Sequence, residues 1–255
     1  MDAPPPPPPA RAVIPTGPET MTGSRWRLRT AGAWWRILLP LGAVVLGLAT
    51  MVAAVLAQKS LGAGEDARNI VGVAIGSATI LLVGACVLRA VSPAQRRVML
   101  AYKGRLRSTI AIGFGIGAAI LVGSAMVIGA GSWLDDGARR ALEDAQPDLA
   151  NVWWQSVILV VALVVLAPLG EETLFRALEL RGLVRLVPFA VAAPISGILF
   201  MAAHFDAWIA WPRALALIAT GLTLAWLYRW RGWPASVTAH ATVNAVAAIA
   251  LIAQA

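Results

Sequence analysis

The chain has 255 residues, of which 59% are hydrophobic and only 13% are charged, and its mean hydropathy is +0.74. This balance excludes an ordinary soluble domain and indicates a membrane protein. The net charge is +8, but the basic residues cluster at the ends of apolar segments, which favours a topology signal over nucleic-acid binding. Cys86 is the only cysteine, so an intrachain disulfide and a cysteine-rich metal site are both excluded.

Residues 1–30 differ in composition from the rest of the chain. Six consecutive prolines, Pro4 to Pro9, precede a polar run without apolar periodicity. This pattern predicts a disordered, proline-rich tail with polyproline II character, and it lacks the features of a signal peptide. The tail is interpreted as a solvated tether, with a docking site for a proline-recognising domain as the alternative.

Seven apolar segments follow the tail, and they predict an all-α, polytopic transmembrane bundle. We expect N-terminal transmembrane helices without a recognisable motif over 31–150 and a second domain over 151–255. The fifth and sixth segments are short, so we expect them to be tilted, kinked at Pro188 or Pro194, or only partly spanning. The segments lie near 36–57, 70–91, 109–130, 152–170, 189–204, 213–229 and 233–253.

The basic residues predict the orientation of the bundle. With a cytoplasmic N-terminus, 16 of the 21 Lys and Arg residues fall on the cytoplasmic side, and most acids fall on the other. The positive-inside rule therefore predicts a multi-pass protein of the cell membrane with its N-terminus in the cytoplasm. Tryptophans near the predicted segment ends, such as Trp133 and Trp153, are typical of an interfacial aromatic belt.

An adjacent acid pair, Glu171 and Glu172, follows the fourth apolar segment. In a continuing helix, Glu172 and Arg176 share a face and can form an ion pair. Glu171 is rotated from Glu172 by about 100°, so it stays available for general-base chemistry. The alternative is that both acids only mark the cytoplasmic end of the segment.

The only two histidines, His204 and His240, both lie in apolar sequence. Ionisable side chains are costly inside a membrane, so this placement points to a functional site. Asn244 lies four residues after His240, which puts the imidazole and the carboxamide on one helix face. The alternatives are a hydrogen-bonded packing histidine at His204 and an Asn–His stripe that only holds helices together.

Three signatures occur in order on consecutive segments: Glu-Glu-x-x-x-Arg from Glu171, Phe-x-x-x-His from Phe200, and His-x-x-x-Asn from His240. This series resembles the CPBP family, also called Abi or CAAX-protease-like, which comprises intramembrane endopeptidases. The resemblance covers about residues 152–250. It implies hydrolysis of a peptide bond in a membrane-anchored protein substrate. Such a substrate could carry a lipid and end in a CAAX-like C-terminus.

The resemblance also implies roles for the residues. Glu171 would activate water, with Glu172 close enough to share that role, and His204 would hold the water. His240 and Asn244 would stabilise the oxyanion, while Arg176 and Phe200 would support the site. Family members have been described both as metalloproteases and as metal-independent glutamate proteases. No His-Glu-x-x-His occurs in the chain, so we favour the mechanism without a cofactor; a bound zinc would use Glu171, His204 and His240.

Two other functions remain as alternatives to a peptidase. One is a non-proteolytic protein that binds a membrane partner or confers bacteriocin immunity, and the other is a transporter with a proton relay. The expected partners are membrane lipid and a membrane-anchored protein. Depth along the helices presents one difficulty: His240 lies about seven residues after its segment begins, which matches the level of Glu171 only if residues 177–187 project from the membrane or lie along it.

Overall fold

A computed structural model describes residues 24–144 and 152–253 of the chain. Over these two ranges the protein is helical and has no strand, apart from an isolated antiparallel bridge between Tyr102 and Gly232. The predicted all-α bundle is therefore confirmed. Most of the expected proline-rich tail, residues 1–23, lies outside the described residues.

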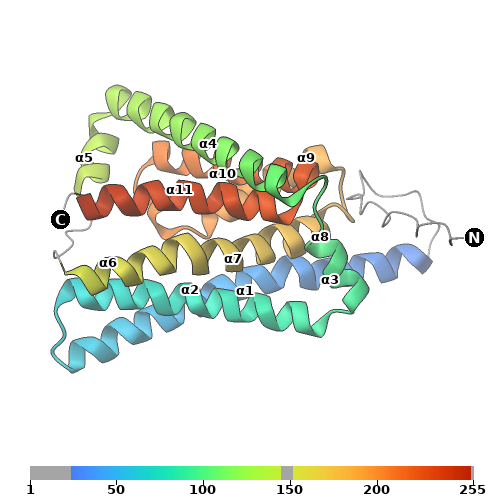
Figure 1. Ribbon diagram of the computed structural model, residues 1–255, viewed down its shortest axis with the longest axis horizontal. Helices are drawn as coiled ribbons and strands as arrows, with labels where there is room; N and C mark the ends of the chain where they lie inside the picture. The colour runs from blue at the N-terminus through green and yellow to red at the C-terminus, as the bar shows by residue number, and fades with distance from the viewer. Residues whose placement is uncertain (1–23, 145–151, 254–255) are drawn as a thin grey trace, which may run out of the picture.

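Seven main helical elements run along the long axis of the molecule and correspond to the seven predicted segments (Figure 1). They are α1 (Ser24–Ser60), α2 (Glu65–Ala90), α4 (Leu106–Leu134), a continuous element over Trp153–Leu183, α9 (Phe189–Ala202), α10 (Trp211–Arg231) and α11 (Trp233–Ala253). Short helices α3 (Pro93–Met99) and α5 (Asp136–Asp144) and a 3₁₀ turn, η3 (Phe205–Trp208), lie in the connections.

Within the described residues, four helices are long and apolar enough to cross a membrane, which makes the chain an integral membrane protein. These spans are Gly32–Ser60, Ala67–Ala90, Leu106–Leu134 and Trp153–Leu183. Helix α9 is shorter, with 14 residues, as expected for the fifth segment. Pro188 is its N-cap and Pro194 lies inside it.

The Trp153–Leu183 element switches from α-helical to π-helical winding twice. It consists of α6 (Trp153–Val160), the π-helical stretch η1 (Val161–Leu166), α7 (Ala167–Glu171), a second π-helical stretch η2 (Glu172–Leu180) and α8 (Arg181–Leu183). Pro168 has no backbone N–H, and proline is one of the usual causes of a locally rewound or kinked helix. The predicted fourth segment ended at residue 170, and the continuing helix considered for Glu172 and Arg176 extends to Leu183 with a π-helical winding that the sequence did not predict.

The continuation removes the difficulty over depth. Residues 177–180 are fully buried and belong to a stretch that packs against α1 and α9, so they do not form an exposed strip along the membrane. Because a π-helix closes its hydrogen bonds over five residues, it advances less per residue than an α-helix. Glu171 Oε2 lies 3.9 Å from His240 Nε2, so the two residues reach the same level within the bundle.

Helix α11 packs closely against α4 along a seam of small residues. A Cβ added at Gly113 would lie 2.7 Å from the carbonyl oxygen of Ala235, and one at Gly117 would lie 2.7 Å from that of Ala239. Small residues four apart let two helix backbones approach in a membrane. The Gly-x-x-x-Gly spacing of Gly113 and Gly117 therefore sets the position of α11, which carries His240.

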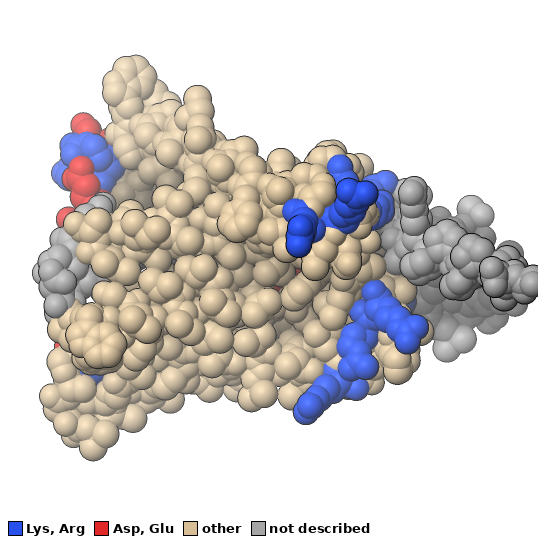
Figure 2. All heavy atoms as spheres, viewed as in Figure 1, with Lys and Arg blue, Asp and Glu red and all other residues tan. Residues whose placement is uncertain are grey.

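Charged residues are distributed unequally between the two ends of the bundle. Figure 2 shows Lys and Arg gathered at the end where α3 and α8 lie, whereas acids appear at the opposite end, near α5, mixed with basic side chains. At that opposite end the Asp135 carboxylate accepts hydrogen bonds from the backbone N–H groups of Gly137 and Ala138 and from the Trp211 indole. The bonds from Ala138 and Trp211 lower the pKa of Asp135 and join α5 to the start of α10.

Candidate active site

Three elements bring the predicted acid and both predicted histidines together. Glu171 ends α7, His204 follows α9, and His240 lies one-third of the way along α11. Glu171 Oε2 is 3.6 Å from His204 Nε2 and 3.9 Å from His240 Nε2. This oxygen is buried and has no hydrogen-bond partner, although the Glu171 side chain as a whole is 13% exposed. The two imidazoles therefore flank an acceptor that is unpaired.

The neighbouring carboxylate of Glu172 has the opposite environment. Its side chain is fully buried, and Oε2 is 3.3 Å from Arg176 Nε. The same oxygen accepts a short hydrogen bond from the Ser236 hydroxyl. The other oxygen, Oε1, is 3.0 Å from His240 Nδ1. The predicted ion pair between Glu172 and Arg176 is thus confirmed, and Glu172 also orients His240.

Arg176 connects this carboxylate to a second buried acid. Its Nη1 donates to the Ser196 hydroxyl at 2.8 Å, and that hydroxyl donates to Glu179 Oε2 at 2.8 Å. The guanidinium also lies over the ring of Phe200, 4.8 Å from its centroid. Because Arg176 is fully buried, it belongs to the interior of the site, although the topology count placed it among the cytoplasmic charges.

Phe200 is the aromatic centre of the cluster. Its ring centroid is 4.5 Å from that of His204 and 5.6 Å from that of His240, and it also packs edge-on against Phe175. The Phe200 carbonyl oxygen is 2.7 Å from His204 Nδ1. Since a carbonyl can only accept, Nδ1 of His204 carries the hydrogen and Nε2 faces Glu171. Phe200 therefore fixes both the tilt and the tautomer of His204.

Asn244 lies one turn beyond His240 and contacts the backbone of the same long helix. Its Nδ2 donates to the carbonyl oxygen of Leu163 at 2.8 Å. In the π-helical stretch the Ala167 N–H bonds to Ala162, five residues back. The corresponding donor for Leu163 would be residue 168, which is a proline without an N–H. Asn244 thus satisfies a carbonyl that Pro168 leaves free, and it keeps one amide hydrogen and its own oxygen.

Three polar residues of this network were not predicted from the sequence: Ser236, Ser196 and Glu179. Ser236 precedes His240 by four residues, so the helix-face argument that selected Asn244 also points to it. Ser196 likewise precedes Phe200 by four residues. Glu179 lies three residues after Arg176 in an otherwise apolar stretch, and a buried acid of that kind is itself a signal of a polar network.

A zinc ion held by Glu171, His204 and His240 is the alternative to a mechanism without a cofactor. Within the part of the chain that the structure describes, no group of three or more His, Cys, Asp and Glu side chains is arranged to hold a metal ion. Glu171, His204 and His240 approach one another, but the arrangement as it stands does not form a ligand set. We therefore derive no step through a metal.

The fold and the site together define a helical membrane protein with buried and partly buried acids and histidines at the level where three of its helical elements meet. Residues 153–246 match the family model described as Type II CAAX prenyl endopeptidase Rce1-like, so this part of the chain is an Rce1-like domain. The resemblance drawn from the three signatures is therefore confirmed. Neither the search of curated proteins nor the search of solved structures gave a match.

Proposed function

We propose that the protein is an intramembrane endopeptidase in which Glu171 activates water to hydrolyse a peptide bond of a membrane-anchored protein. The observation that carries this proposal is the contrast between the two acids. Glu172 is fully engaged by Arg176, Ser236 and His240, whereas Glu171 Oε2 is unpaired and faces two imidazoles. Of these two acids, Glu171 is the one with an oxygen free to receive a proton.

The gap between Glu171 and His204 suits a bridging water. Glu171 Oε2 is 3.6 Å from His204 Nε2 and 3.9 Å from His240 Nε2, which is long for direct hydrogen bonds. A polar contact of this length is commonly bridged by water. One hydrogen of the water would point to Glu171 Oε2 and the other to His204 Nε2, which is an acceptor in the tautomer that Phe200 fixes. The oxygen lone pair would then face the substrate carbonyl.

In the proposed reaction, the water oxygen bonds to the carbonyl carbon while Glu171 takes its proton. The carbonyl oxygen gains the negative charge, and the C–N bond then breaks as the amide nitrogen receives the proton from Glu171. His240 can donate to the oxyanion through Nε2 when both ring nitrogens are protonated, and the Glu172 carboxylate at Nδ1 stabilises that charge. Asn244 would supply its remaining amide hydrogen.

The family model and the membrane setting support a substrate class for this proposal. A CAAX-type peptidase embedded in a membrane points to a prenylated or otherwise lipid-modified protein whose scissile bond lies near its C-terminus. We infer that the lipid keeps the substrate in the bilayer while the backbone reaches Glu171.

The proposal is tested by cleavage of a quenched fluorescent, lipid-modified peptide by the full chain in detergent. Glu171→Gln should lower the rate by about 10³-fold or more, since it removes the general base. His240→Ala should cost about 10²–10³-fold through the loss of an oxyanion donor. Glu143→Gln is the matched control, because Glu143 forms an exposed ion pair with Arg139 far from the site. This variant should cleave the peptide at the wild-type rate.

A parallel assay with a strong chelator separates the two chemistries considered for the family. The Glu171 mechanism predicts an unchanged rate, and a loss that zinc restores would replace it with a metal mechanism. Full activity of Glu171→Gln would contradict the assignment of the base. If a variant without Glu171 and His204 still bound its membrane partner or still conferred bacteriocin immunity, that result would instead support the non-proteolytic function.

A further inference from the structure

A groove separate from the Glu171 site lies on the outer surface between α9 and α10. Its volume is about 570 Å³, and it is lined on the α10 side by Leu222, Trp226 and Trp230. These three side chains are 39%, 53% and 39% exposed, so this face of α10 points outward from the bundle. In an integral membrane protein, an outward apolar face is in contact with lipid.

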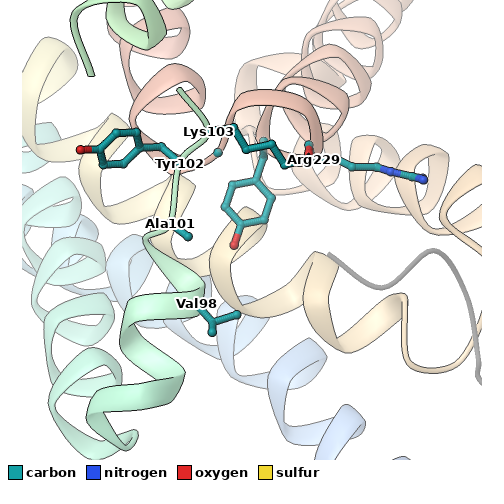
Figure 3. Close-up of a pocket in the computed structure, with 7 residues that line it drawn as sticks. Val98, Ala101, Tyr102, Lys103 and Arg229 are labelled. Atoms are coloured by element: carbon teal, nitrogen blue, oxygen red, sulfur yellow. The ribbon is translucent and has the colours of Figure 1, made fainter. Parts of the chain in front are cut away.

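Two cations stand at one end of the groove. Arg229 comes from the last turn of α10, and its guanidinium carbon is 4.2 Å from the ring centroid of Phe189 at the start of α9. Lys103 comes from the connector before α4, and its Nζ donates to the Arg229 carbonyl oxygen at 3.4 Å. Figure 3 shows Lys103 next to Arg229 at this junction. None of the residues that line the groove is acidic, so nothing within it neutralises the pair.

The apolar part extends from these cations into the membrane. Arg229 and Leu222 are seven residues apart on α10, which corresponds to about 10 Å along the helix axis. Trp226 lies between Arg229 and Leu222, and Trp230 follows Arg229, in the positions that aromatic residues take at a membrane interface. The groove thus has a cationic end, formed by Lys103 and Arg229, and an apolar part that suits an acyl chain.

We propose that this groove binds an anionic phospholipid, with its phosphate on Lys103 and Arg229 and an acyl chain along Trp226 and Leu222. A free phosphate would use the cations but leave the apolar channel empty. A zwitterionic lipid carries its own ammonium group, which opposes the two cations. A lipid with a net negative headgroup satisfies both parts, and such lipids give a negative potential to the cytoplasmic leaflet, where the positive-inside rule places the basic end.

The test measures lipid binding by the purified full chain in detergent, using native mass spectrometry and thermal unfolding. Phosphatidylglycerol is compared with phosphatidylcholine of the same acyl chains and with inorganic phosphate. We expect wild type to bind phosphatidylglycerol preferentially and to gain thermal stability from it, because a ligand that binds only the folded state stabilises that state. The double variant Lys103→Gln/Arg229→Gln should bind it about 30-fold more weakly.

Two further variants separate a built site from general surface charge. Arg96→Gln/Arg97→Gln removes the same charge from exposed positions on α3 and should bind like wild type. Ala190→Phe keeps both cations but places a ring in the groove, and it should lose the preference for phosphatidylglycerol. Because each variant is also checked for helical content and a monodisperse elution profile, a folding defect is recognised independently of binding.

The proposal is overturned by any of four results. These are equal binding of both phospholipids by wild type, an unchanged affinity in Lys103→Gln/Arg229→Gln, an equal loss in the α3 double variant, or stabilisation by inorganic phosphate alone that matches the lipid. None of these measurements depends on peptidase activity, so the inference stands apart from the proposed reaction.

Discussion

At the scale of single residues, the site depends on how differently two adjacent carboxylates are held. Glu172 is buried beside a buried arginine, and its oxygens accept from three side chains on two helices. Glu171 makes no such bonds through Oε2. A buried ion pair of this kind contributes little net stability when intact, but removal of one partner leaves an uncompensated charge.

The two acids should therefore separate in their effects on stability. Glu172→Gln leaves the Arg176 guanidinium without its nearest carboxylate and should destabilise the fold by about 3 kcal/mol or more. Glu171→Gln should unfold close to the wild-type temperature, because it breaks no hydrogen bond at Oε2. Thermal unfolding of both variants in the same detergent checks this contrast, and equal melting temperatures would show that Glu172 is not held as described.

Much of the residue cluster could be predicted from local spacing, since Glu172–Arg176 and His240–Asn244 are helix-face relations. The contacts of Asn244 could not. Its bond to Leu163 depends on a π-helical register and on Pro168, which lies 76 residues away in the sequence. The Ser196–Glu179 link likewise exists only because α9 and the long helix meet at one depth. Tertiary register, rather than motif, decides these partners.

At the scale of helices, α11 is held at its start as well as along its length. The connector before α4 lies against the α10–α11 turn, where Lys103 N–H donates to the Arg231 carbonyl and Trp233 N–H donates to the Ala101 carbonyl (Figure 3). Gly232 occupies this turn with φ +98° and ψ −175°, a conformation that is essentially restricted to glycine. A Cβ there would overlap the Ala101 carbonyl oxygen.

Gly232→Ala should consequently destabilise the protein by about 3 kcal/mol and lower cleavage, because α11 carries Ser236 and His240 to Glu172. Gly62→Ala is the matched control: Gly62 also has a positive φ, +77°, but an added Cβ would meet nothing within 4 Å. The control should lose less stability, because alanine there strains the backbone but causes no close contact. Melting temperatures and cleavage rates of the pair test this, and similar losses in both would mean that the close contact at Ala101 has no effect.

The helices themselves were predictable because membrane-length apolar segments are distinct in composition. The winding of Trp153–Leu183 was not, since a run such as Val161–Leu166 has the same apolar character in either helical form. Its π-helical form depends on Pro168, which lacks an N–H, and on side chains such as Asn244 that donate to the carbonyls left free. The short helices α3 and α5 were also missed, because neither has the length of a membrane segment.

At the scale of the whole molecule, the unequal charge at the two ends bears on which side the site opens to. The connection from α2 to α4 holds six basic residues over 89–107, and it lies at the end where Figure 2 shows Lys and Arg gathered. His240 is seven residues into α11 from that same end, about 10 Å along the axis. If the basic end is cytoplasmic, a substrate held in the cytoplasmic leaflet reaches Glu171 over the shorter path.

Because Cys86 is the only cysteine, orientation can be measured with single-cysteine variants on a Cys86→Ser background. Ser60→Cys lies at the end of α1 opposite the basic cluster, and Ala94→Cys lies within it on α3; both positions are exposed. The positive-inside rule predicts that a membrane-impermeant maleimide labels Ser60→Cys in intact bacterial cells and labels Ala94→Cys only after permeabilisation. The reverse pattern would place the short path to Glu171 on the outer leaflet, and a cytoplasmic lipid-modified protein could then not be the substrate.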